Sequence, residues 1–141
     1  MKTADLRVVD IHSRMKIMQK RRKNRLADEA AARLPLRPVA FAVLTALAQG
    51  PRAGFEILEF VNATHPGSGL LGPGTLYRVM RELRQEGLIE RTPAPTEESS
   101  RDERRTYSAL TQLGRATVVA EATRLRRTLT ASGLLEESPA E

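Results

Sequence analysis

The sequence contains no cysteine and no tryptophan, and aromatic residues make up only 4% of its 141 residues. Without cysteine the chain forms no disulfide, thiolate metal site or thiol nucleophile. No apolar run approaches the roughly 20 residues that a membrane-spanning helix needs, and the first residues lack the continuous apolar centre of a secretory signal. These absences predict a cytoplasmic protein without a membrane partner and with one domain of modest core size.

The residues that an enzyme or a metal site would need are also scarce. The two histidines, His12 and His65, are far apart in the sequence, whereas a structural zinc site needs four nitrogen or sulfur ligands at short spacing. No glycine-rich phosphate loop and no nucleophile elbow occurs in the chain. The sequence therefore predicts no enzyme activity, no metal site and no cofactor.

Positive charge is concentrated at one end of the chain. The formal net charge is +6, which favours a polyanionic partner such as nucleic acid. Residues 1–35 hold ten Lys/Arg against four Asp/Glu, whereas residues 36–141 hold thirteen of each. The net charge therefore belongs to the N-terminal segment, and the function of the remaining chain has to be inferred from its motifs.

Residues 1–35 form a basic N-terminal extension that is rich in Ala, Arg and Lys and contains no glycine and no proline before Pro35. This composition favours a helix, but the apolar stripe is thin, so a helix and a disordered tail are both consistent with it. Three roles stay open: a helix that crosses a dimer partner, a DNA-contacting tail through residues 20–25, or a segment upstream of a start at Met15 or Met18.

The next part of the chain predicts three helices, in residues 38–49, 53–65 and 73–86. The third is bounded by Pro73 and Gly87, because proline suits the first helical turn and glycine the position after the last one. Apolar residues recur at i, i+3, i+4 and i+7 along this helix and predict an inward stripe. Its outward side chains are Arg78, Arg81 and Gln85.

Two short alternating segments, residues 88–92 and 105–110, are joined by a polar stretch and predict a β-hairpin. Three helices followed by a hairpin is the order of a winged helix-turn-helix domain. The predicted fold is therefore mainly α with a small β-hairpin, and the winged-helix domain spans residues 36–110.

A last helix is predicted for residues 111–133, with Thr111 as its N-cap and Gly133 as its end. Its apolar stripe is narrow and near heptad spacing, which predicts pairing with a second chain. We therefore expect a C-terminal dimerisation helix and, in residues 134–141, a flexible tail. The predicted dimerisation residues are Val118, Ala122, Leu125 and Leu129.

Three ordered motifs carry a resemblance to a known family: GFEIL (54–58), GPGTLYRVMRELRQEGLIER (72–91) and RRTYSALTQLGR (104–115). Over roughly residues 36–130 the chain resembles the PadR family of transcriptional regulators, and its single C-terminal arm helix resembles the short subfamily. It departs from the pattern in its long N-terminal extension and in the segment 93–104, which lacks glycine at its tip and carries four acidic residues.

The resemblance implies a homodimeric transcriptional repressor that binds double-stranded DNA at a palindromic operator, with the helix from Pro73 in the major groove. Family members often release DNA on binding small aromatic or lipophilic molecules, so a small lipophilic effector is expected. Tyr77 is equally suited to cap the core, and Tyr107 is expected to pack beneath the wing. The implied DNA-contacting residues are Pro73, Gly74, Thr75, Tyr77, Arg78, Arg81, Arg84, Arg101, Arg104 and Arg105.

A second interpretation is a winged-helix adaptor that binds another protein and has no DNA affinity. The neutral charge of residues 36–141 and the acidic residues of the wing favour the adaptor, whereas the outward arginines of the third helix favour DNA. Salt-dependent DNA binding separates the two interpretations, because only contacts to phosphates release counterions.

Overall fold

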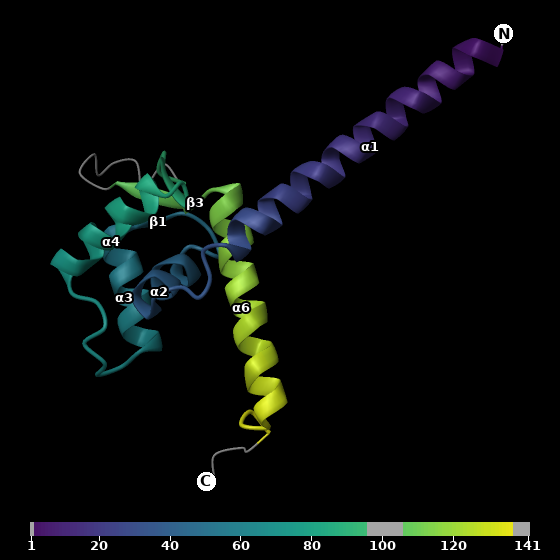
Figure 1. Cartoon of the computed structure of the whole chain (residues 1–141). Helices are drawn as coiled ribbons and strands as arrows, with labels where there is room; N and C mark the ends of the chain where they lie inside the picture. The colour runs from purple at the N-terminus through teal and green to yellow at the C-terminus, as the bar shows by residue number, and fades with distance from the viewer. Residues whose placement is uncertain (1, 96–105, 137–141) are drawn as a thin grey trace.

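A computed structural model describes residues 2–95 and 106–136, with side chains from residue 10 onward (Figure 1). Helices α2, α3 and α4 form a body with a small sheet, and α1 and α6 extend from it in different directions (Figure 1). No described helix is long and apolar enough to cross a membrane. The elements are α1 (Lys2–Ala31), α2 (Pro38–Ala46), β1 (Arg52–Ala53), α3 (Gly54–Thr64), α4 (Pro73–Gln85), β2 (Ile89–Thr92), β3 (Tyr107–Leu110) and α6 (Gln112–Ser132).

The body is held together by one apolar core between α2, α3 and α4. Leu44, Ile57 and Leu76, one from each helix, are at most 2% exposed. Burial of each such side chain stabilises the fold by about 1.5–3 kcal/mol relative to an exposed one. The predicted three helices and the inward stripe of the third are confirmed.

The end of α4 turns the chain directly into the sheet. Gly87 has φ 75°, a left-handed conformation that glycine adopts without strain. The Leu88 N–H donates to the Leu83 carbonyl at 2.9 Å, and the Gly87 N–H donates to the Arg84 carbonyl at 3.0 Å. This pair of bonds satisfies the last carbonyls of the helix and confirms the predicted helix end at Gly87.

The sheet is antiparallel with the order β1-β3-β2. The predicted hairpin of β2 and β3 is confirmed, with Ile89 opposite Leu110 and Arg91 opposite Ser108. Strand β1 was not predicted, because two residues are too few to show an alternating pattern, and its pairing with β3 alone makes it a strand. The segment between the two hairpin strands lies outside the described residues from 96 to 105.

The start of α6 is fixed on the turn that follows α4. The Thr111 hydroxyl accepts a hydrogen bond from the Gly114 N–H at 3.0 Å and donates one to the Gly87 carbonyl at 2.6 Å. A Cβ on Gly114 would lie 1.8 Å from the Leu88 carbonyl oxygen, so only glycine fits this approach. The predicted Thr111 cap is confirmed, and the direction of α6 is tied to that of α4.

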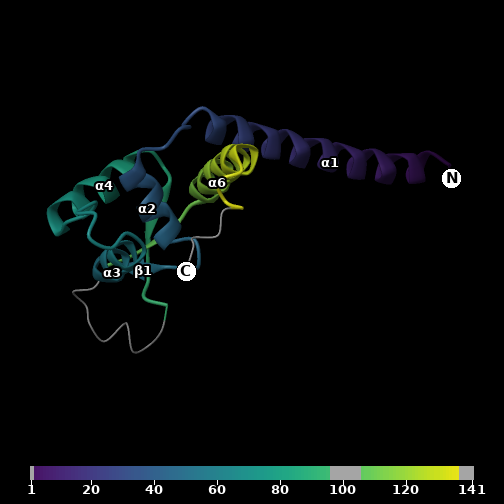
Figure 2. The ribbon, with the colours of Figure 1, turned by 90° about the horizontal axis from the view of Figure 1, so that it is seen from below.

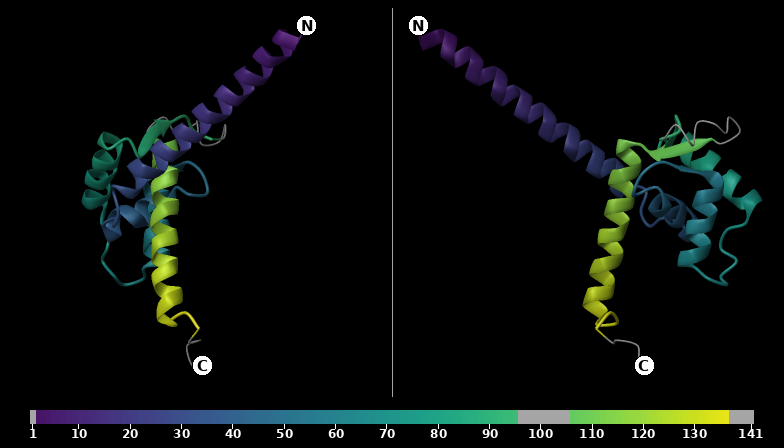
Figure 3. Two further views of the ribbon diagram at one scale, coloured as in Figure 1. Left: turned by 45° about the vertical axis from the view of Figure 1, so that its right-hand side comes forward. Right: turned by 180° about the vertical axis from the view of Figure 1, so that it is seen from behind.

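Helix α1 resolves the open alternatives for the N-terminal extension in favour of a helix. It has 30 residues and is therefore about 45 Å long. Only its last turns pack on the rest of the chain, where Ala30 is 1% exposed and Leu26 is half-buried. Figures 2 and 3 show these turns beside the start of α6 and the rest of α1 extending away from the body.

The joint between α1 and the body is held by a buried carboxylate on α6. One oxygen of Glu121 accepts a hydrogen bond from the Leu36 N–H at 2.5 Å, and the other accepts one from Arg124 Nε at 2.5 Å. The Arg124 bond, aided by the Leu36 bond, keeps the Glu121 pKa below its usual value even though burial acts in the opposite direction. Glu121 thus anchors the linker that follows α1.

Candidate nucleic-acid interface

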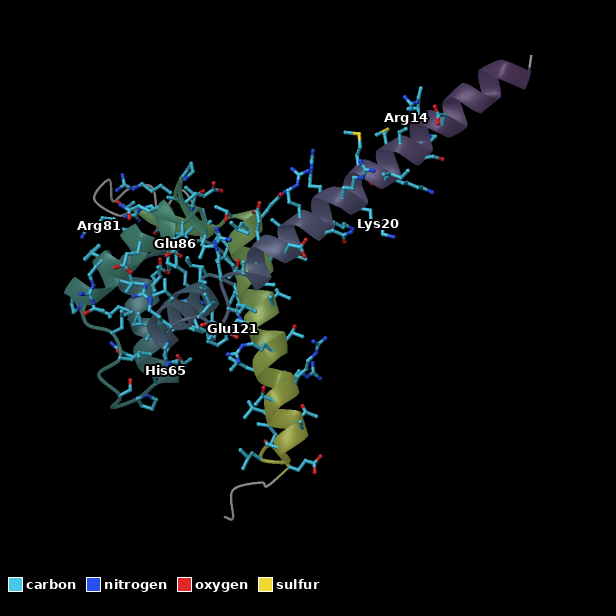
Figure 4. The ribbon with its side chains drawn as sticks, viewed as in Figure 1. Arg14, Lys20, His65, Arg81, Glu86 and Glu121 are labelled. Atoms are coloured by element: carbon cyan, nitrogen blue, oxygen red, sulfur yellow. The ribbon has the colours of Figure 1, made fainter. Side chains whose placement is uncertain are left out.

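The outer face of α4 carries polar and cationic side chains over an apolar inner face. Arg78, Arg81 and Gln85 are exposed, as their spacing predicted, and Tyr77 is 63% exposed. Figure 4 shows Arg81 on α4, at the side of the body away from α1. The core holds this helix rigidly from behind while its outer side chains are free to contact a partner.

The first turn of α4 offers unpaired backbone donors. Gly72 precedes the helix in an extended conformation and provides no side-chain cap, and Pro73 occupies the first turn. Pro73 and Gly74 are exposed and Thr75 is partly exposed. Because the N–H groups of a first helical turn lack intrahelical partners and carry partial positive charge, this end of α4 suits a phosphate.

The two tyrosines have different environments. Tyr107 is 3% exposed, which confirms its predicted packing under the hairpin. Tyr77 does not cap the core. Its ring lies beside the start of α3, where a Cβ on Gly54 would lie 3.7 Å from the Tyr77 hydroxyl oxygen. Tyr77 is therefore placed to contact a partner of α4.

A group of three arginines extends the cationic surface from α4 onto the sheet. The pKa of Arg84 is lowered, first by burial and then by the nearby positive charges of Arg91 and Arg81. Within residues 10–95 and 106–136, none of the three forms an ion pair. Arg91 was missed by the sequence analysis, because only the turn after α4 brings β2 back beside the helix.

The acidic residue on this side of α4 has its own partner. Glu82 accepts a hydrogen bond from Arg37 at 2.6 Å, and this bond holds the pKa of Glu82 below its usual range. Its negative charge is therefore compensated first by Arg37 in the linker before α2, and the charges of Arg78 and Arg81 add smaller contributions. The predicted wing contacts Arg101, Arg104 and Arg105 lie outside the described residues.

The predicted dimerisation stripe divides into two parts. Val118 is 5% exposed and packs in the core of its own chain, so its place in an interface between chains is corrected: the body itself covers it. Ala122 is exposed, Leu125 is half-buried and Leu129 is 37% exposed. The stripe is thus open to solvent only in the part of α6 that extends beyond the body.

A second open apolar seam lies on α1. Ile11, Met15 and Met18 are 58%, 53% and 66% exposed, and their spacing of i, i+4 and i+7 puts them on one side of the helix. At the junction of α1 and α6 a groove of 650 Å³ runs between Leu26, Arg22 and Arg115. Among the described residues no group of His, Asp or Glu side chains is arranged to hold a metal ion.

The sequence profile of the transcriptional regulator PadR-like family matches residues 43–120, which is more than half of the chain. The chain belongs to the PadR-like family. The match runs from α2 to the first half of α6 and includes all of α4 and the hairpin. It confirms the resemblance inferred from the three motifs, and the family is one of transcriptional regulators.

Solved structures of similar fold are winged-helix regulators. A mutant of MarR from E. coli has a TM-score of 0.58 and 21% identity, with 90% of this chain and 85% of MarR covered. A mutant of ZitR from Lactococcus lactis has a TM-score of 0.56 and 22% identity, with 71% of this chain and 60% of ZitR covered. The adhesin competence repressor AdcR from Streptococcus pyogenes has a TM-score of 0.54 and 16% identity, with 86% and 80% covered.

These identities show the fold alone, and the chain spans only 60% of the length of ZitR. No curated protein matches this PadR-like chain. The winged-helix fold predicted from the order of the elements is confirmed.

Proposed function

We propose that this PadR-like regulator is a repressor that binds a palindromic operator as a homodimer, with one α4 in the major groove of each half-site. The observation that carries the proposal is the outer face of α4, where Tyr77, Arg78 and Arg81 are exposed on a helix held rigidly by the core. The name of the streptococcal neighbour, a repressor of the same fold, favours repression.

Each exposed residue of α4 has a role that fits its chemistry. Arg78 reads a base edge, because a guanidinium can donate two hydrogen bonds to guanine, worth about 1–3 kcal/mol of discrimination. Thr75 and Tyr77 contact phosphates, together with the open N–H groups of the first turn. Arg81 and Arg84 lie further along the helix and contact the DNA backbone. The wing residues Arg101, Arg104 and Arg105 are assigned to phosphates from the sequence pattern alone.

The two helices that leave the body support the proposed homodimer. A helix without tertiary contacts is only marginally stable in water, and most of α1 touches no other described element (Figure 3). A second copy of the chain would cover the seam of Ile11, Met15 and Met18 and the open part of the α6 stripe at Leu125 and Leu129. Two copies related by a two-fold axis would present their α4 helices about 34–36 Å apart, which is one turn of DNA.

We assign the binding site for a small lipophilic effector to the joint of α1 and α6. The groove of 650 Å³ there is bordered by Arg22, Lys23 and Arg115, which suits a lipophilic molecule with an acidic group. A ligand that binds only one orientation of the arm would shift the population of dimers toward or away from the spacing that fits DNA.

The first experiment measures binding of the purified full-length chain to fluorescent DNA from its own promoter region at several salt concentrations. We expect sequence-selective binding whose log affinity falls linearly with log salt, and a loss of about fivefold to 150-fold for Arg78→Ala on the selected site, corresponding to about 1–3 kcal/mol. The matched control is Arg127→Ala, since Arg127 is an exposed arginine on α6.

If Arg78→Ala binds the selected site and random DNA with the same affinities as wild type, Arg78 does not contact a base. A folded, dimeric chain that shows no DNA selectivity at low salt would contradict the proposed operator binding and favour the adaptor interpretation.

A further inference from the structure

A small hollow lies between α4, the start of α3 and the sheet. Its volume is 210 Å³, which is below the roughly 300–1,000 Å³ of pockets for drug-sized ligands. Two arginines from different elements border it, Arg84 from α4 and Arg91 from β2. The remaining lining residues are Ala53, Gly54, Phe55, Tyr77, Met80 and Thr106.

The two arginines carry positive charge that the described part of the chain does not compensate. Arg84 is partly buried, and neither Arg84 nor Arg91 has a carboxylate partner among the described residues. The acidic side chain at the start of α3, Glu56, is already engaged, because its Oε1 accepts a hydrogen bond from the Ala53 N–H at 3.0 Å. A partly buried positive charge with a second, exposed arginine at the same hollow favours an anion as the missing partner.

The same side of the sheet has a polar group without a partner. The Ser108 hydroxyl is fully buried and, among the described residues, forms no hydrogen bond. Ser108 lies directly opposite Arg91 in the β2–β3 register, and residues opposite each other on antiparallel strands share one face of the sheet. The neighbourhood of the arginine pair therefore also holds a buried hydroxyl, which can donate or accept a hydrogen bond but carries no charge to compensate the arginines.

The position of the hollow identifies the source of the anion. It lies between the exposed face of α4, through Tyr77, and the hairpin, through Arg91 of β2 and Thr106 just before β3. A helix in the major groove is flanked by the phosphates of both strands, and about half or more of the hydrogen bonds in protein–DNA complexes go to phosphates and sugars. We propose that the hollow seats one backbone phosphate of the operator, held by Arg84 and Arg91 together. This inference rests on the proposed binding of α4 to DNA.

A shared phosphate predicts a particular pattern of binding losses. Arg84→Gln and Arg91→Gln should each weaken DNA binding about tenfold, equally for selected and random duplexes, because a phosphate carries no sequence information. Each should lower the slope of log affinity against log salt by about 0.9, the contribution of one phosphate. The double variant should lose much less than the product of the two single losses. Arg127→Gln on α6 is the control of equal charge change.

The decisive measurement replaces the phosphates of the duplex one at a time with uncharged methylphosphonate. At one position per half-site, wild type should lose about tenfold in affinity, whereas Arg84→Gln and Arg91→Gln should lose nothing further. Circular dichroism and thermal unfolding show that the variants are folded. The inference is overturned if the losses multiply at every position or if both variants bind like wild type.

The failure of this inference is distinguishable from that of the proposed function. If wild type binds DNA selectively and Arg84→Gln and Arg91→Gln bind with the same affinity, the DNA-binding role is supported and only the phosphate site is contradicted. Wild type that binds no DNA would remove both.

Discussion

Helix α1 and the winged-helix body are both mainly helical, but they are stabilised in different ways. In the body, each helix buries an apolar face against the others, and Leu44 and Ile57 are fully buried. In α1, every described residue from 10 to 25 is exposed. Helix propensity favours a helix in α1 but left a disordered tail equally open, and the persistence of the helix in water depends on a partner.

The net positive charge and the candidate interface also lie in different regions of the molecule. Figure 4 shows Arg14 and Lys20 along the part of α1 that extends away from the body, and Arg81 on α4 at the other side. Most of the basic excess of the sequence therefore lies far from the helix that we assign to the major groove. The binding surface of the body depends on a few placed arginines rather than on overall charge.

The largest expected effect breaks the body where α6 meets the turn after α4. Gly114→Ala would place a methyl group 1.8 Å from the Leu88 carbonyl oxygen, and such overpacking against backbone should lower the free energy of unfolding by about 3 kcal/mol. Denaturant unfolding measures the change. Gly74→Ala is the matched control, since a Cβ there meets nothing within 4 Å. Equal stability of the two variants would contradict the close approach of α6 to Leu88.

A smaller effect is expected at the joint between the two regions. Glu121→Ala leaves the Leu36 N–H without its acceptor, which should cost about 1–3 kcal/mol of unfolding free energy. Glu121→Gln keeps an acceptor oxygen and should lose less. Arg37→Gln, which removes an exposed ion pair instead, is the control and should change stability least.

The lowered pKa of Glu121 gives this joint a pH dependence. A carboxyl with a lowered folded-state pKa stabilises the fold fully above its ordinary pKa, about 4.3, and the contribution is lost as the pH falls below that value toward the folded-state pKa. Unfolding measured from about pH 6 down to about pH 3 should therefore show a steeper loss in wild type than in Glu121→Gln. Parallel curves would contradict a role for the charged form.

A substitution on α1 is expected to have the smallest effect on the stability of the body. It should change the self-association of the chain instead. Met18→Glu puts a charge in the open seam and should weaken the dimer, while the unfolding of the body stays within about 0.5 kcal/mol of wild type. Ile17→Glu is the matched control, because Ile17 is also exposed but stands about 100° around the helix from Met18. Sedimentation velocity measures both, and equal association of the two variants would remove the seam from the interface.

Features that depend on neighbouring residues in the chain were predictable. The helix boundaries at Pro73, Gly87 and Gly133 follow from the fixed φ of proline and the left-handed φ of glycine. The inner and outer faces of α4 follow from the helical period, and the Thr111 cap follows from its hydroxyl before a helix. The family resemblance through residues 72–91 and 104–115 rests on the same local motifs, and the profile match confirms it.

Features that depend on contacts between distant residues were not predictable. Strand β1 exists through its pairing with β3, and Val118 is buried because the body reaches over the first half of α6. The sequence spacing of Val118 with Leu125 cannot show where that cover ends. The charged residue Glu121 is buried only because the linker at Leu36 folds back on it across 85 positions of sequence.

Beyond residue 35, the sequence alone determined which segments are helices or hairpin strands, where the helices begin and end, and which family the chain resembles. These features depend on backbone preferences and short-range periodicity. The tertiary structure decided that Arg91 joins Arg84 at one hollow, that Gly114 is required by the Leu88 carbonyl, and that α1 leaves the body with its apolar seam open. Those outcomes depend on how distant segments are brought together, and neither local propensity nor periodicity contains that information.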